Sequence, residues 1–234
     1  MSVNEIRDRL TQLGDQQKAQ ALQKFFKTGP GEYGEGDIFL GIRVPDLRRL
    51  VGIYQALPIP QALRLLRSPV HEERLFAILL MVRTYSKASE PEKERLYEIY
   101  LENTTYINNW DLVDSSAPQI VGAFLIDKDK KPLYRLAKST SLWERRIAIM
   151  ATAYFIKKNE FEAALRISEM LLSDREDLVH KAVGWMLREI GKRNLAEEEL
   201  FLSRHYQTMP RTMLRYAIEK FPEPKRRRYL EGKI

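Results

Sequence analysis

Apolar residues recur every three to four positions along most of the chain. In residues 4–27 this spacing, which includes Leu10, Leu13 and Leu22, predicts a helix. From Asp37 onwards, segments of about 12 to 18 residues with the same spacing alternate with short stretches rich in Pro, Ser, Asp or Asn. The sequence has neither strand-like alternation nor Asn-Gly hairpin signals. The pattern therefore predicts an all-α fold.

Local signals predict where several helices begin. A Ser followed three residues later by Glu forms a capping box, and this pairing occurs at Ser89–Glu92, Ser141–Glu144 and Ser173–Glu176. Pro45 stands at a position that favours the first turn of another helix.

The glycine-rich stretch 29–36, GPGEYGEG, is predicted to be a loop. It lacks the Lys-Ser/Thr ending of a phosphate-binding loop, and its two Glu residues would repel a triphosphate. A linker is the favoured interpretation, with Tyr33 as a candidate contact residue.

Four of the predicted helices share a motif in which a basic residue precedes a small residue within an apolar run. The segments are EERLFAILLM (72–81), WERRIAIMAT (143–152), VHKAVGWMLR (179–188) and RTMLRYAIEK (211–220). Their small residues, Ala77, Ala148, Gly184 and Ala217, are 71, 36 and 33 residues apart. The first interval spans two repeats, and the skipped one is centred near Leu112.

Periods in the thirties, each containing a helix pair, are typical of an α-solenoid, or superhelix, of HEAT-like repeats. We expect one domain over residues 1–234. Its parts would be N-terminal helices (1–28), a Gly-rich loop (29–36), helical repeats (37–222) and a basic tail (223–234).

Composition narrows the function classes. There are 39 Lys and Arg against 32 Asp and Glu, a net charge of +7, which favours an anionic partner, with nucleic acid ahead of a membrane surface. With no Cys, a disulfide, a thiol nucleophile and a thiolate metal site are excluded. The three His residues are scattered, so no metal and no cofactor are expected. No apolar run is long enough for a membrane span or signal peptide, so a cytoplasmic location is expected.

The stretch NNWDLVDSSAP, residues 108–118, is the first candidate site. Trp110 and Asp114 are four residues apart and so share one face of a helix. Asn108 is the expected N-cap, and Asp111 suits the first turn. Pro118 should end or kink the helix. Trp110 and Asp114 either face a ligand together, or the indole packs in a core while the two acids are solvated or cap the helix.

Residues 177–192 separate into two helical stripes. The apolar stripe contains Val179, Ala182, Val183, Met186 and Ile190. The other contains Lys181, Trp185, Arg188 and Lys192. Three cations around an indole suit a phosphodiester backbone with an aromatic contact. The alternative is that Trp185 packs under Arg188 as a local cation–π pair.

Other cations extend this surface. Arg146 and Lys157 share a helix face eleven residues apart, and Arg211 and Arg215 are one turn apart. Paired helices of a solenoid present equivalent faces, which predicts a concave, basic DNA-binding face. The KRRR sequence at 225–228 would add non-specific attraction.

Several motifs in order resemble the AlkD-type DNA alkylation-repair glycosylases. They are FLGIRVPDLRRL, NWDLVDSSAP, SLWERRIAIMATAYFIKK, HKAVGWMLREIGKRN and MPRTMLRYAIEKF, which together cover nearly the whole chain. The resemblance implies a HEAT-like repeat fold. It also implies an enzyme that excises N3- and N7-alkylated, cationic purines from duplex DNA without flipping the base into a pocket, leaving an abasic site.

The resemblance also implies roles for individual residues. Asp114, Trp110 and Trp185 match the family's catalytic trio, and Arg146 matches its DNA-backbone arginine. Lys181, Arg188 and Lys157 fall where the family places cations on the same surface. The expected partner is double-stranded DNA containing alkylated bases, bound by a monomer.

Two other functions remain open at this point. One is a non-catalytic HEAT-like module that binds bent or branched DNA, which needs the basic face but has no use for Asp114. The other is a scaffold whose concave face binds an acidic protein. Loss of DNA affinity with salt would separate DNA binding from the scaffold, and base release would separate the enzyme from the module.

Overall fold

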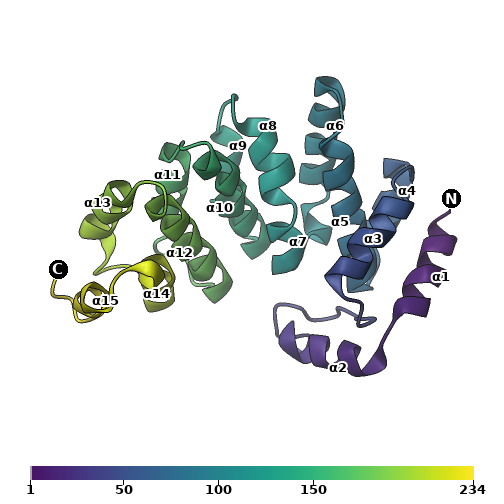
Figure 1. The fold of residues 1–234 in the computed structure, drawn as a ribbon, viewed down its shortest axis with the longest axis horizontal. Coiled ribbons are helices and arrows are strands. Elements are labelled where there is room, and N and C mark those ends of the chain that lie inside the picture. The colour runs from purple at the N-terminus through teal and green to yellow at the C-terminus, as the bar shows by residue number, and fades with distance from the viewer. Residues whose placement is uncertain (1) are drawn as a thin grey trace. The chain divides into compact units, whose positions relative to one another are not determined.

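Helices form nearly all the regular structure in the computed structural model, which describes residues 2–234 (Figure 1). Within these residues there is no strand, and the β-type pairing present is an isolated parallel bridge between Ile38 and Val70. The all-α prediction is confirmed. The chain divides into two compact units, Met1–Ser116 and Ala117–Ile234, each described here by itself. The proposed division into N-terminal helices, loop, repeats and tail stays a prediction.

The first unit is built on the long helix α5. Its elements are α1 (Val3–Leu13), α2 (Gln16–Phe25), α3 (Val44–Ile53), α4 (Ile59–Leu66), α5 (His71–Tyr85), α6 (Glu90–Glu102), the 3-10 turn η1 (Thr104–Tyr106) and α7 (Trp110–Asp114). Almost every residue of α5 is buried, and α3 and α4 pack against it. A helix that is apolar or buried on all sides belongs to the interior of its unit.

The helical segment predicted for residues 4–27 forms two helices, α1 and α2, with a break between them. Gly14 ends α1, and Asp15 begins α2 by accepting a hydrogen bond from the Lys18 N–H at 3.1 Å. The apolar spacing continues through this break because both helices bury residues against the same unit, so periodicity alone does not reveal it. Pro45 lies in the first turn of α3 as predicted.

The second unit continues the alternation of helices and short loops. Its elements are the π-helix η2 (Pro118–Gly122), α8 (Ala123–Leu125), α9 (Lys131–Leu136), α10 (Leu142–Lys157), α11 (Glu162–Met170), α12 (Asp177–Gly191), α13 (Leu195–His205), α14 (Arg211–Ala217), the 3-10 turn η3 (Ile218–Lys220) and α15 (Glu223–Leu230). Helix α12 packs between α10 and α14. The segment predicted as a basic tail is helical and anchored by buried Tyr229.

Small residues let these helices approach closely, as the repeat motif predicts. A Cβ at Gly184 of α12 would lie 2.3 Å from the Met213 carbonyl and 2.5 Å from the Tyr216 Cβ in α14. A similar contact occurs in η2, where a Cβ at Gly122 would lie 2.2 Å from the Ala151 carbonyl. Only glycine fits such distances.

The predicted capping boxes have three different outcomes. Ser89 and Glu92 form the complete box, and the Ser141 hydroxyl accepts from the Glu144 N–H at 3.5 Å. The third start, at Ser173, is wrong because α12 begins at Asp177, after Glu176. The intervening Asp174 carboxylate accepts from the Glu176 N–H at 2.9 Å and holds those residues in a turn.

Candidate functional site

The short helix α7 carries the first candidate residues, Trp110 and Asp114, at its two ends. Its N-cap is Asn109, whose side-chain oxygen accepts from the Trp110 N–H at 2.8 Å, so the prediction of Asn108 as N-cap is wrong by one residue. Asp111 lies in the first turn as predicted. The helix ends at Asp114, ahead of the π-helix that begins at Pro118, which confirms the predicted break.

Trp110 is partly buried and packs on one side against aromatic rings. Its indole stacks on Phe26, with ring centroids 5.1 Å apart and planes inclined by 8°. Phe25 meets the same indole edge-on at 6.0 Å. The interpretation of Trp110 as a packed residue is therefore correct for one part of the ring, and another part is accessible.

Phe25 is an exposed aromatic residue beside Trp110 that the sequence does not single out. It is 64% exposed, although it adjoins Trp110. The Tyr33 hydroxyl, from the glycine-rich loop, donates to the Phe25 carbonyl oxygen at 3.4 Å, so Tyr33 and Trp110 flank the same residue. The sequence does carry a signal: Phe25 and Phe26 are adjacent in a helix and so point about 100° apart, which leaves one of them off the buried face.

Asp114 is half-buried at the C-terminal end of α7. It lies near Tyr100, whose hydroxyl is 2.9 Å from the Ser116 Oγ. Burial raises the pKa of Tyr100, and the negative charge of Asp114 raises it further. The carboxylate of Asp114 is therefore close enough for its charge to act on the buried phenol of Tyr100.

In the second unit, α10 carries Arg146 and Lys157. Arg146 is only 5% exposed, and its Nη1 donates to the Leu178 carbonyl oxygen just inside α12. This burial differs from the open surface position expected of a phosphate contact, because the guanidinium also ties α10 to α12. Lys157, in the last turn of α10, is exposed and has no carboxylate within 4 Å among residues 2–234.

Helix α12 separates into two stripes as predicted, with the five apolar residues all buried. The polar stripe is less positive than expected, because each of its cations pairs with a carboxylate. Lys181 pairs with Asp177 at 2.7 Å and Lys192 with Glu189 at 2.5 Å, while Arg188, with 15% of its side chain exposed, pairs with Glu219.

Trp185 is partly exposed within this stripe. Its indole N–H donates to the Glu189 carboxylate at 3.0 Å, and the part of the chain that the structure describes contains no cation–π pair between Trp185 and Arg188. The local cation–π alternative is therefore wrong. Beyond α12, Arg211 and Arg215 of α14 are both exposed.

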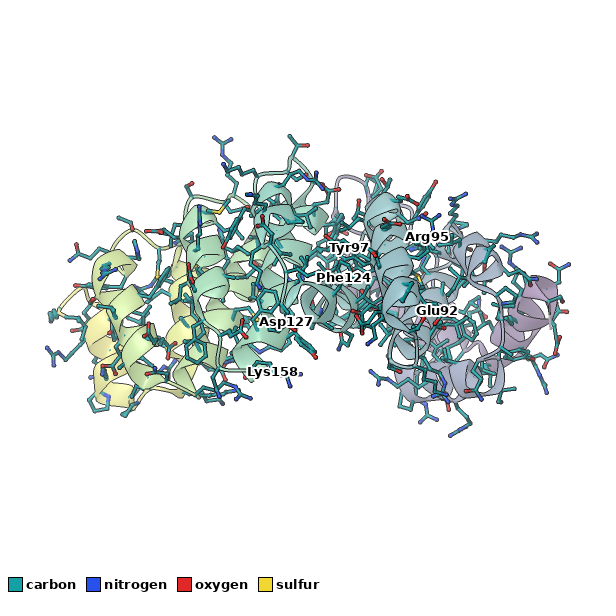
Figure 2. All side chains as sticks on the ribbon, turned by 90° about the horizontal axis from the view of Figure 1, so that it is seen from above. Glu92, Arg95, Tyr97, Phe124, Asp127 and Lys158 are labelled. Atoms are coloured by element: carbon teal, nitrogen blue, oxygen red, sulfur yellow. The ribbon has the colours of Figure 1, made fainter. Side chains whose placement is uncertain are left out.

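A separate hollow of about 370 Å³ in the first unit contains none of these residues. It lies along α6, where Glu92 and Arg95 border it (Figure 2).

Comparison with known proteins identifies the family. The sequence matches the DNA alkylation repair enzyme family over residues 6–221. The chain belongs to this family. No curated protein matches the chain.

Solved structures of other proteins share the fold. A predicted DNA alkylation repair enzyme from Enterococcus faecalis has a TM-score of 0.68 at 16% identity, with 90% of this chain and 97% of that chain covered. AlkD2 from Streptococcus mutans has a TM-score of 0.55 at 20% identity, with 89% and 99% covered. The smu.31 protein from Streptococcus mutans UA159 has a TM-score of 0.54 at 19% identity, with 88% and 98% covered. These likenesses confirm the predicted helical-repeat class, while the basic DNA-binding face stays a prediction.

The candidate site residues belong to both units. Trp110, Asp114 and Tyr33 belong to the first unit, and all the candidate cations and Trp185 belong to the second. No helix within residues 2–234 is long and apolar enough to cross a membrane.

Proposed function

We propose that this DNA alkylation repair enzyme is a monofunctional glycosylase that hydrolyses the N-glycosidic bond of N3- and N7-alkylated purines in duplex DNA and leaves an abasic site. The observation that carries the proposal is the pairing on α7 of a partly accessible indole, Trp110, with a half-buried carboxylate, Asp114. We place its action in the cytoplasm, on the nucleoid, as a monomer.

The chemistry needs little beyond these groups. An N3- or N7-alkylpurine is already cationic, so it leaves as a neutral base without a strong general acid. The bond electrons depart with the base and leave an oxocarbenium-like sugar, which the Asp114 carboxylate stabilises. The same carboxylate orients the attacking water and accepts its proton.

The remaining residues bind and orient the DNA. The ring faces of Trp110 and Trp185 offer negative potential to the cationic nucleotide. Arg146, Lys157, Lys181, Arg188, Lys192, Arg211 and Arg215 contact the phosphate backbone, which fixes position without reading sequence. Selectivity then comes from the lability of the lesion itself, since no flipped base needs a pocket.

Asp114→Asn is the decisive variant because it preserves size and removes the charge. With duplex DNA containing N7-methylguanine, the parent should release free base and generate abasic sites, and the variant should be slower by about 10²-fold or more in single turnover. Its DNA affinity should be equal or slightly higher, because a negative charge facing phosphate is gone. Excision by Asp114→Asn at the parental rate would remove Asp114 from the chemistry.

The second candidate function is a non-catalytic module that binds bent or branched DNA. It needs the same exposed cations, such as Arg211 and Arg215 of α14, and has no use for Asp114. A parent protein that binds DNA in a salt-dependent manner but releases no base would establish this alternative.

A further inference from the structure

A buried polar cluster lies beneath α7, and the proposed chemistry uses none of its members. It contains Asp37, His71, Arg74, Asn109 and Asp111. His71 and Asn109 are at most 2% exposed, and Asp111 has 14% of its side chain exposed. Placing so many polar groups in an interior is costly unless each is bonded, so the cluster calls for an explanation.

His71 joins two carboxylates. Its Nδ1 is 3.2 Å from the Asp37 Oδ2, and its Nε2 is 2.8 Å from the Asp111 Oδ2. Ionised carboxylates only accept hydrogen bonds, so both ring nitrogens must donate, and the ring is an imidazolium. Arg74 Nη2 donates to the other Asp37 oxygen at 2.6 Å, which leaves two positive and two negative charges in balance.

The same histidine supports Trp110 through a stack of rings. His71 stacks on Phe39, with centroids 4.5 Å apart, and Phe39 stacks on Phe26 at 4.8 Å. Phe26 in turn stacks on Trp110 at 5.1 Å. His71 is thus connected to Trp110 in two ways: through the stacked rings, and through its hydrogen bond to Asp111, the next residue in the chain after Trp110.

The N-terminal end of α7 is fixed by this cluster. Asp111 lies in its first turn, and its second oxygen accepts from the Leu112 N–H at 2.9 Å. The N-cap Asn109 donates to Asp37 at 3.0 Å. The backbone of α7 is therefore set by polar bonds from one side and by the ring stack from the other.

We propose that His71 is a positioning residue for the reaction. By holding Asp111 and the ring stack together, it sets the orientation of α7 and of the two residues that α7 presents. This inference rests on the proposed function for its catalytic consequence, and the contacts themselves do not depend on it. Misplacement of a reacting group by about 1 Å can cost on the order of 10²-fold in rate, so small movements of α7 matter.

Simple stabilisation explains the cluster less well. Replacement of buried ion pairs by apolar residues is often neutral or stabilising, so such a cluster is weak support for a purely stabilising role. A geometric role accounts for the bonds of His71 and Asn109, which connect Asp37 to the N-terminal end of α7. Arg74 fixes Asp37 in turn and also donates to the Ser68 carbonyl oxygen at 3.1 Å.

Protonation of His71 then controls the geometry. Burial lowers its pKa, but the hydrogen bonds to Asp111 and Asp37 and the charge of Asp111 outweigh burial and the opposing charge of Arg74, so the pKa rises from 6.5 to about 9. The contribution to stability is complete below the ordinary value of 6.5 and is lost as pH rises through about 9. A neutral ring can donate to only one carboxylate, so the link from Asp37 through His71 to Asp111 of α7 loses one of its two hydrogen bonds.

The first test follows His71 and Trp110 in the full chain by NMR between pH 7 and 10. The ring nitrogens of His71 and the indole N–H of Trp110 should titrate with one midpoint near pH 9. The matched control is His205→Gln, a half-buried histidine of α13 outside the cluster, which should leave both signals unchanged. A Trp110 signal that ignores the titration of His71 would overturn the inference, whether or not the protein excises bases.

The second test measures single-turnover excision of N7-methylguanine. The parental rate should fall through the same midpoint while DNA affinity stays constant. His71→Gln should lower the rate at pH 7 by about 10-fold or more, with affinity within about 2-fold, and its rate should no longer fall near pH 9. An equal loss of affinity, or a parental rate, would overturn the inference.

Asp111→Asn keeps the test decisive if His71→Gln fails to fold. It preserves shape and removes one of the two charges that hold the proton, so the midpoint of the Trp110 signal should move below 9. An unmoved midpoint would contradict the role given to Asp111. Failure of the parent to release any base would instead refute the proposed function, and the NMR coupling would still decide the contacts.

Discussion

Trp110 combines two roles that are usually assigned to different residues. Its stacked face supports the aromatic cluster of the first unit, and in the proposed function its accessible part faces the lesion. Loss of the Trp110 side chain should therefore lower both the stability of the fold and the rate of excision. A variant of the neighbouring Phe25 helps to separate these two effects.

We expect Trp110→Ala to lower the free energy of unfolding by about 3 kcal/mol or less, below the cost of deleting a fully buried Trp, and to reduce excision strongly. Phe25→Ala should leave stability almost unchanged, because Phe25 is 64% exposed, while it weakens contact with the damaged strand. Urea unfolding and single-turnover excision measure the two effects. If Trp110→Ala instead loses the roughly 3–5 kcal/mol in the free energy of unfolding that is typical of a fully buried Trp, then Trp110 is a core residue.

Arg146 should behave as both a structural and a binding residue. Arg146→Ala removes the bond to the Leu178 carbonyl and should lower the free energy of unfolding by about 1–3 kcal/mol. It should also weaken binding to damaged and undamaged duplex alike, since a phosphate contact carries no sequence information. The exposed Lys157→Ala is the control, with weaker binding but parental stability. Unchanged DNA affinity in Arg146→Ala would leave the arginine a purely structural role.

At this scale, the sequence predicted what depends on local spacing. The shared face of Trp110 and Asp114 and the break before Pro118 follow from positions a few residues apart. The cluster around His71 was missed because its partners are 34 and 40 residues away and no local pattern marks them. The burial of Arg146 was missed for the same reason: its partner is a backbone carbonyl on another helix.

Among the elements, α12 best shows how packing and charge share one helix. Its apolar stripe is buried and its cations pair with Asp177, Glu189 and Glu219. The stripes themselves were predictable from a period of 3.6 residues. The neutralising partner Glu219 was not, because it comes from η3, 31 residues further along the chain.

Gly184→Ala tests the close approach of α12 and α14. The added methyl group would meet the Met213 carbonyl at 2.3 Å, so we expect a loss of about 1–3 kcal/mol in the free energy of unfolding. Gly52→Ala in α3 is the matched control, because its Cβ would meet nothing within 4 Å and helix propensity favours Ala by about 0.5–1 kcal/mol. Equal stability of the two variants in urea would mean that the α12–α14 contact yields without cost.

For the whole molecule, the net charge of +7 matters only through the cations left free to meet phosphate. Lys157, Arg211 and Arg215 are exposed and have no carboxylate within 4 Å among residues 2–234. Salt dependence of DNA binding counts such contacts, because each neutralised phosphate releases counterions.

Arg215→Gln should reduce the slope of log affinity against log salt by about 0.9, and it should weaken binding to all duplexes similarly. Lys93→Gln serves as the control: this lysine lies on α6 and is already paired with Glu90 at 2.7 Å, so the slope should not change. Parental salt dependence in Arg215→Gln would place α14 outside the DNA contact.

At this largest scale, the helical-repeat class was predictable from a motif repeated along the chain, and the family was predictable from several different motifs in their order. The division into two compact units was not, because the apolar periodicity runs through Ser116 without interruption. Which segments form separate units depends on contacts between distant residues, and a periodic pattern contains no record of them.

The glycines of the second unit indicate how such a chain can change length. The neighbours of Gly122, Ala151 and Tyr154, follow it by 29 and 32 residues, and those of Gly184, Met213 and Tyr216, follow at the same intervals. Removal of the 61 residues between the two glycines together with Gly184 would leave Gly122 followed by Met213 and Tyr216 at the unchanged intervals of 29 and 32 residues. Insertion or loss of whole repeats thus preserves the close contact between each glycine and its carbonyl and tyrosine neighbours, whereas insertion or loss of a few residues would disrupt it. The length of this chain can therefore change only in steps of whole repeats.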